Sequence, residues 1–287
     1  MADWHKKTLN GVELAYLSRG EGPLVVLIHG FPDTAEAFEF ALEPLAEAGY
    51  RAVSLETRGY PPSGLSSGND YSLPTLARDV SEFITALGLQ KAVVVGHDWG
   101  AVIGAATAAY FPDRLAGLVL VGFPHISRAK VTIGALLQRP HHLLFQFGAF
   151  GRWLTARKDL AYLDRMVRVW APNWELPPGY MERVKAALRE PERLKAVLEY
   201  YVQIWQRRKD RAMLEILARP LAMPGLIIGG LDEPAFRQQW LRDSAGCFSP
   251  PAPVVLWPEV GHWPHAEAPD RFLARLLEFL AVASPVR

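Results

Sequence analysis

The fold of this chain is decided by the stretch Val93-Val94-Val95-Gly96-His97-Asp98-Trp99-Gly100, which is followed by the small residues Ala101-Val102-Ile103-Gly104-Ala105. The apolar run predicts a buried strand, and the small residues predict a helix that leaves close to that strand. Between them, the pattern Gly-x-Asp-x-Gly is typical of a sharp strand-to-helix turn that presents its middle residue, here Asp98. Small flanking residues are needed because such a turn is strained and tightly packed.

An aspartate at the tip of this turn restricts the chemistry that the turn can support. A carboxylate that attacks an acyl carbonyl forms an unstable anhydride, whereas attack on an sp³ carbon forms an ester that water can later cleave. Asp98 therefore favours an epoxide or an alkyl halide as the substrate, and the absence of serine at this position argues against an esterase. The alternative is a surface aspartate that caps a helix.

Segments on both sides of the turn alternate between strand and helix patterns. Apolar or alternating runs predict strands at 12–17, 24–28, 51–55, 115–121, 226–228 and 253–257, and helical periodicity predicts helices near 35–48, 76–87 and 269–280. This alternation predicts an α/β fold with a mostly parallel, doubly wound sheet. Ligands of such sheets bind at the carboxyl ends of the strands.

The alternation stops in the middle of the chain. Residues 126–221 show aromatic and basic helical segments, punctuated by prolines, and no convincing strand. This stretch is too long for a simple crossover loop. We therefore expect a helical lid at 126–221, inserted into a core formed by residues 1–125 and 222–287.

Composition excludes several classes of protein. The chain has 287 residues, and its 31 basic and 30 acidic residues give a net charge of +1, so nothing favours nucleic acid or a membrane surface as a partner. The single cysteine, Cys247, excludes an intramolecular disulfide and a multi-cysteine metal site. No signal peptide or apolar run long enough to span a membrane is evident. We expect a cytoplasmic protein with no cofactor or metal. The sequence is compatible with a homodimer.

Three motifs occur in a characteristic order along nearly the whole chain: His29-Gly30-Phe31-Pro32, the Asp98 turn, and Gly261-His262-Trp263. Together they resemble the α/β-hydrolase fold and, within it, the epoxide hydrolases, with the haloalkane dehalogenases as near relatives. The resemblance implies a covalent ester on Asp98 and a water activated by His262, whose side chain suits proton transfer near neutral pH. It also implies an oxyanion hole formed by the backbone N–H groups of Phe31 and Trp99.

The resemblance further implies a carboxylate that orients His262, placed after the penultimate strand in a G-x-x-D pattern. The sequence Gly229-Gly230-Leu231-Asp232-Glu233-Pro234 permits two registers, which select Asp232 or Glu233. The distance from Pro224, and the ending Glu-Pro-Ala-Phe, favour Glu233. Asp232 is the alternative, because aspartate is the more usual residue type.

Opening an epoxide produces an alkoxide, which needs a proton or hydrogen-bond donor. The segment 198–201 resembles the lid segment that supplies one tyrosine donor in epoxide hydrolases, and it selects Tyr201. The segment 141–146 resembles the segment that supplies the other donor, and it places His141 where tyrosine is usual. His142 is the alternative for this second position.

These residues predict an epoxide hydrolase that converts a small hydrophobic epoxide and water to a vicinal diol. A haloalkane dehalogenase is the alternative, because Trp99 and the lid tryptophans could bind a halide, although Phe31 stands where such enzymes often carry asparagine. A non-catalytic ligand receptor of the same fold is a third interpretation. The complete set of nucleophile, base and acid candidates argues against it.

Overall fold

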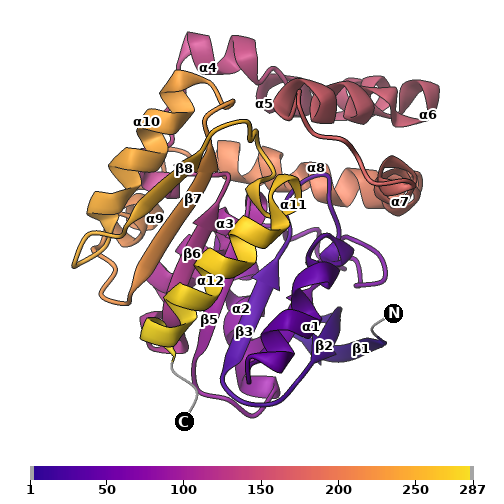
Figure 1. Cartoon of the computed structure of the whole chain (residues 1–287). Helices are drawn as coiled ribbons and strands as arrows, with labels where there is room; N and C mark the ends of the chain where they lie inside the picture. Colours follow the sequence, from indigo (N-terminus) through magenta and orange to yellow (C-terminus); the bar gives the residue numbers. More distant parts are fainter. Residues whose placement is uncertain (1–2, 285–287) are drawn as a thin grey trace.

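The computed structural model describes residues 3–284, and within them eight strands form one sheet in the order β1-β2-β4-β3-β5-β6-β7-β8 (Figure 1). The strands are β1 (Trp4–Leu9), β2 (Val12–Arg19), β3 (Leu24–Ile28), β4 (Arg51–Leu55), β5 (Ala92–His97), β6 (Leu115–Val121), β7 (Gly225–Gly230) and β8 (Val254–Trp257). The β1–β2 and β2–β4 pairs are antiparallel and the other pairs are parallel. The predicted α/β fold with a mostly parallel sheet is confirmed.

Helices cover both faces of the sheet, because successive side chains of each strand point to opposite sides. On one face, Val25 and Leu27 of β3 share a buried cluster with residues of α1 (Glu39–Glu47) and α12 (Pro269–Ala283). On the other face, Val26 and Ile28 share a cluster with α2 (Leu73–Ala86) and α3 (Trp99–Tyr110). This double coverage explains why the central strands are continuously apolar.

A helical insertion separates β6 from β7 and lies over the carboxyl ends of the strands (Figure 1). Its helices are α4 (Ile133–Gln138), α5 (His141–Leu144), α6 (Gly148–Trp170), α7 (Tyr180–Leu188), α8 (Pro191–Gln206) and α9 (Arg211–Leu217). The backbone of α6 is interrupted by non-helical dihedrals from Arg157 to Leu160. No strand lies in this part of the described chain. These helices fall within the predicted lid at 126–221, whose limits stay a prediction.

Two local features differ from the sequence-based expectation. Strand β1 was not predicted, because it is an almost entirely exposed edge strand. Its charged lysines interrupt the alternation of apolar and polar residues that usually indicates a strand. The helix expected at 35–48 begins as a 3₁₀ turn, Ala35–Phe38, before α1 starts.

The remaining helices lie near the carboxyl end of the chain. After α10 (Ala235–Ser244) and β8, a short helix, α11 (Pro264–Glu267), precedes α12. Among the described residues, no helix is both long enough and apolar enough to cross a bilayer.

Candidate active site

Asp98 lies at the tip of the turn between β5 and α3, with φ 48° and ψ −110°. A side chain other than that of glycine is strained in this region of backbone space. The neighbouring glycines are required by close packing. A Cβ atom on Gly96 would lie 2.1 Å from the carbonyl oxygen of Gly100, and one on Gly100 would lie 2.0 Å from that of Ile28. The turn therefore holds the Asp98 carboxylate at the carboxyl end of the central strands.

The structure brings Asp98, His262 and Glu233 into one line of contacts. His262 Nε2 lies 3.3 Å from Asp98 Oδ2, and His262 Nδ1 lies 2.6 Å from Glu233 Oε1. All three side chains are buried. Asp232 does not contact His262; its carboxylate accepts a hydrogen bond of 2.7 Å from Asn173 Nδ2. The contact with the histidine ring is thus made by Glu233, the register favoured by the sequence.

Both carboxylates of this line are ionised at neutral pH. Burial would raise the pKa of Asp98, but the hydrogen bond and charge of His262 hold it below its usual range. Burial would likewise raise the pKa of Glu233, but Arg139 and Arg237 hold it below its usual range. A charged Asp98 can act as a nucleophile, and a charged Glu233 can stabilise a protonated His262.

Two buried arginines that were not predicted from the sequence surround Glu233. Arg139, from the turn after α4, donates a short hydrogen bond to Glu233 Oε2, and its guanidinium lies 4.1 Å from the ring centre of Trp170. Arg237, in the first turn of α10, lies 3.1 Å from the same oxygen. Arg237 also donates a 2.7 Å hydrogen bond to the carbonyl of Gly122. The four-residue spacing of Glu233 and Arg237 was the one available signal.

The backbone N–H of Phe31 donates a 3.1 Å hydrogen bond to Asp98 Oδ1. Since Oδ2 faces His262, the two carboxylate oxygens occupy different environments. Trp99 follows Asp98 as the first residue of α3, so its N–H is one of the unpaired donors of the helix amino terminus. These placements are compatible with the oxyanion hole that the resemblance implies.

Asp98 lines a cavity of about 290 Å³ beneath the lid helices. Its wall is largely apolar and includes Val102, Phe123, Ile204, Met213, Leu217 and Trp240. Pockets of this type bind small molecules through apolar surface and a few directed polar groups. The polar groups of this wall include Asp98, Tyr201 and His142.

The structure differs from the expectation for His141. His141 does not line the cavity; its ring is buried, 4.8 Å from that of Trp170 and 5.6 Å from that of Phe145, centre to centre. His142 lines the cavity instead, and its ring centre lies 5.5 Å from that of Tyr201. Both histidine rings lie 5.5 Å from the Tyr201 ring, centre to centre, but only that of His142 also lines the cavity. Segment similarity alone could not fix this register.

Tyr201 and Tyr200 have separate roles in packing. Tyr201 lines the cavity with its ring 5.0 Å from that of Trp99, centre to centre. The hydroxyl of Tyr200 instead donates a 2.6 Å hydrogen bond to the carbonyl of Arg58. Burial and the charge of Asp98 raise the pKa of Tyr201 well above its ordinary value, although a hydrogen bond with the Trp99 side chain opposes the shift. Tyr201 is therefore a neutral phenol at neutral pH.

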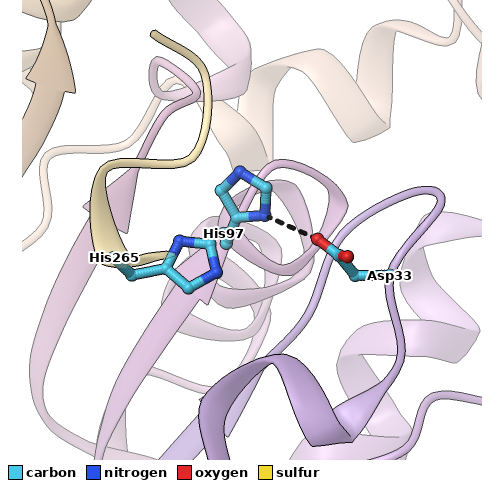
Figure 2. Close-up of side chains that lie close together, drawn as sticks. All are labelled: Asp33, His97 and His265. Carbon is cyan, nitrogen blue, oxygen red and sulfur yellow. Dashed lines mark ion pairs between the residues drawn. The ribbon is translucent and has the colours of Figure 1, made fainter. Parts of the chain in front are cut away.

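A second polar cluster, Asp33, His97 and His265, lies beside the nucleophile turn but outside the cavity lining (Figure 2). The ligand atoms of these buried residues lie within 4.8 Å of one another, a spacing that could hold a metal ion. The Asp33 carboxylate already accepts hydrogen bonds from Tyr180 and, at 2.7 Å, from Trp263 Nε1. Asp33 therefore links the lid and the His262 loop to the core. These hydrogen bonds explain why a carboxylate is buried at this position, and no metal ion is needed to explain it.

With this geometry established, comparison with known proteins places the chain in a class. The family described as "alpha/beta hydrolase fold" matches residues 23–269. This match includes the Asp98 turn, Glu233 and His262, and it spans most of the chain. The protein belongs to the α/β-hydrolase superfamily.

Individual relatives agree with that assignment. Epoxide hydrolase A of Mycobacterium tuberculosis (strain H37Rv) is 29% identical, over 94% of this chain and 95% of its own. A protein of Bacillus subtilis named AB hydrolase superfamily protein YfhM is 28% identical over the same shares. A solved structure from Pseudomonas aeruginosa, provisionally assigned as an epoxide hydrolase, is 27% identical with a TM-score of 0.86, and the match covers 98% of this chain and 96% of that one. The protein is a hydrolase.

Glu233→Gln is expected to slow hydrolysis of the Asp98 ester more than its formation, because only hydrolysis requires an oriented His262 that takes up a proton from water. Its contact of 2.6 Å with His262 Nδ1 is the physical reason. A loss of about 10²–10⁴-fold in the hydrolytic step is expected for an impaired general base. Single-turnover kinetics would separate the two steps.

Asp232→Asn is the matched control, because Asp232 contacts Asn173 rather than the histidine. It should leave both steps close to those of the unmodified enzyme. Circular dichroism should accompany both variants, since Glu233 also neutralises two buried arginines. A larger hydrolytic defect in Asp232→Asn than in Glu233→Gln would contradict the assignment.

Proposed function

We propose that this protein is an epoxide hydrolase that forms a covalent alkyl ester on Asp98 and then hydrolyses it. The observation that carries the proposal is the arrangement of Asp98 between the Phe31 N–H and His262, facing a cavity whose wall also carries Tyr201. The small volume and apolar wall of that cavity favour a small hydrophobic epoxide as the substrate.

In the first step, Asp98 Oδ2 attacks one epoxide carbon, and the bond between that carbon and the ring oxygen breaks. The electron pair of the broken bond goes to the oxygen, which accepts a proton from Tyr201. His142 is the second donor that we propose, in place of His141, because His142 lines the cavity beside Tyr201. Burial lowers the pKa of His142 to about 4, so its ring is neutral and donates through one N–H.

In the second step, His262 takes a proton from water, and the resulting hydroxide attacks the carbonyl carbon of the ester on Asp98. The negative charge develops on Oδ1, which already accepts the Phe31 N–H at 3.1 Å. Trp99 N–H is the second donor that we propose for this oxyanion. The intermediate collapses when the bond between the carboxyl carbon and Oδ2 breaks, and the departing diol takes the proton that His262 held. The remaining proton of the attacking hydroxide returns to the Tyr201 phenolate, which restores both the Asp98 carboxylate and the neutral phenol. Glu233 stabilises His262 while it is protonated.

Parallel assays with styrene oxide and 1-bromobutane test this function. Turnover of styrene oxide to its diol is expected, with little release of bromide from 1-bromobutane. A haloalkane dehalogenase is the second candidate, because Trp99 and Trp205 both line the cavity and indole N–H groups can bind halide. Faster release of bromide than of diol would select it. Ligand binding without turnover of either compound would indicate a receptor.

Tyr201→Phe is expected to slow epoxide opening by about 10²–10⁴-fold, the usual effect of losing a general acid. His142→Phe should also slow opening, by a smaller factor, because a neutral imidazole is the weaker proton donor. Hydrolysis of a preformed ester should stay nearly intact in both variants. Rapid-quench measurements on styrene oxide would determine the rate of opening.

Tyr200→Phe and His141→Phe are the matched controls, since neither side chain lines the cavity. Tyr200→Phe removes the hydrogen bond to the Arg58 carbonyl, so we expect lower stability without a specific loss of ring opening. Unchanged opening rates in Tyr201→Phe and His142→Phe would show that the lid donors are wrongly assigned. A selective defect in His141→Phe would restore the sequence-based choice.

A further inference from the structure

The outer layer of the lid carries an unusual set of exposed apolar side chains. In Figure 1, α4, α5 and α6 are the elements farthest from the sheet. The exposed large apolar residues of the stretch 133–153 have 45–80% of their surface accessible: Ile133, Leu137, Leu143, Phe147, Phe150 and Trp153. Val131, just before α4, is 63% exposed. We call these seven residues the lid face. Apolar groups gathered in this way usually mark an interaction surface.

Helical spacing places members of the lid face beside one another. Ile133 and Leu137 are four residues apart on α4, and Phe150 and Trp153 are three apart on α6. The ring centres of Phe150 and Trp153 are 5.7 Å apart, so these two side chains form one exposed aromatic pair. Side chains of this kind insert between lipid headgroups when they are flanked by cations.

The same segment is strongly cationic, which the net charge of the whole chain conceals. Residues 128–158 contain six Lys and Arg residues and no Asp or Glu, in a chain whose net charge is +1. One of the six, Arg139, is buried against Glu233. The other five have no ion-pair partner among residues 3–284: Arg128, Lys130, Arg152, Arg157 and Lys158. The segment therefore presents uncompensated positive charge next to the lid face.

Exposed residues of this segment form part of the cavity wall. Lys130 and Val131 line the cavity, and both are exposed to solvent. A membrane bound to the lid face would therefore lie next to this part of the cavity wall. If the proposed function holds, a lipophilic epoxide could pass from the bilayer to Asp98 without crossing bulk water.

We propose that the lid face docks on the surface of an anionic lipid bilayer. Apolar and aromatic side chains flanked by lysine and arginine are the composition of interfacial membrane-binding segments. A second copy of this chain is a poorer occupant, because a symmetric contact would place two acid-free cationic segments against each other. The absence of any acidic residue from 128 to 158 thus favours an anionic partner, and the protruding aromatic pair favours a lipid one.

Vesicle flotation with purified full-length protein tests the proposal. We expect binding to vesicles that contain phosphatidylglycerol, weaker binding to pure phosphatidylcholine vesicles, and a decrease as the salt concentration rises. Binding should also shift the emission of Trp153 to shorter wavelength, and Trp153→Phe should remove that shift. The Asp98→Ala variant should bind equally well, so failure of the proposed function would not affect this result.

Two sets of variants test the two components of the surface. Phe150→Ser with Trp153→Ser should weaken binding to both kinds of vesicle. Arg157→Gln with Lys158→Gln should weaken only binding to phosphatidylglycerol vesicles, by about 5-fold for each charge removed. Val282→Ser and Lys91→Gln are the matched controls, since both positions are exposed and lie outside the lid.

Absence of binding to phosphatidylglycerol vesicles would overturn the proposal, as would equal losses in the controls. Analytical ultracentrifugation distinguishes the other occupant. Self-association that Phe150→Ser with Trp153→Ser abolishes, without vesicle binding by the unmodified protein, would show that a second copy covers the lid face.

Discussion

Asp98→Ala is expected to abolish epoxide turnover, with a loss on the order of 10⁶-fold, as is found when a covalent nucleophile is removed. No other carboxylate lines the cavity among the described residues, so no neighbour can replace Asp98. The measurement is steady-state diol formation from styrene oxide, compared with circular dichroism of the same sample to show that the fold persists.

The covalent intermediate can be trapped by removing the base. His262→Ala should still form the ester, because attack by Asp98 Oδ2 needs no general base, but should fail to hydrolyse it. Mass spectrometry of this variant mixed with epoxide should show a gain equal to the mass of the substrate, located on the peptide that contains Asp98. An unmodified peptide after prolonged incubation would exclude the covalent mechanism.

The strained backbone of the turn also affects the stability of variants at Asp98. At φ 48° and ψ −110°, Asp98 occupies a region that glycine tolerates better than other residues. Asp98→Gly should therefore be more stable than Asp98→Ala by about 1 kcal/mol, the reverse of the usual order for these two residues. Urea unfolding of both inactive variants would measure the difference.

The protein is expected to lose stability steeply between pH 6.5 and pH 4, because several buried histidines must be neutral in the fold. Burial lowers the pKa of His97 to about 3, and those of His125 and His142 to about 4. Burial also lowers the pKa values of His141 and His265 well below the ordinary value. In this pH range the unfolded chain binds protons that the folded chain excludes, so unfolding is favoured as the pH falls.

The size of the effect follows from the shifts. Each of the three histidines with a pKa of 3 to 4 contributes a loss of up to about 2 kcal/mol at pH 5, since one pKa unit corresponds to about 1.4 kcal/mol. Asp98 and Glu233 add little at pH 5, because the stability that comes from their lowered pKa values is lost mainly as the pH falls below their ordinary values of 3.8 and 4.5. His29, whose pKa is raised, acts in the opposite sense. The total loss at pH 5 should be several kcal/mol.

Urea unfolding at pH 7.5 and pH 5 measures this dependence. His265→Phe should reduce it, because the His265 ring is buried 4.5 Å from Phe38, centre to centre, and neither of its nitrogens has a hydrogen-bond partner in the described structure. His5→Gln, on the exposed strand β1, is the control and should leave the dependence unchanged. Equal stability of the unmodified protein at both pH values would contradict this account.

The contacts of the lid show which site residues could not be assigned from short stretches of sequence. His141 and His142 are adjacent and chemically identical, and only the packing of α5 against Trp170 and the cavity selects which one faces the substrate space. Arg139 gave no signal in the sequence, because its partner Glu233 is 94 residues away in another element. By contrast, the local sequence favoured Glu233 over Asp232, and in the structure Glu233 contacts the His262 ring whereas Asp232 contacts Asn173.

The sequence by itself determined the buried parallel strands, the turn after β5 and the candidate nucleophile. Buried parallel strands are read from continuous apolar runs, and the glycines around Asp98 are demanded by backbone geometry within a few residues. These are local requirements, so they are visible in local sequence. The tertiary structure decided the positions of the buried arginines around Glu233, the histidine that lines the cavity, and the presence of Lys130 and Val131 in the cavity wall. Those features depend on contacts between distant segments, whose approach is fixed only when the whole core packs.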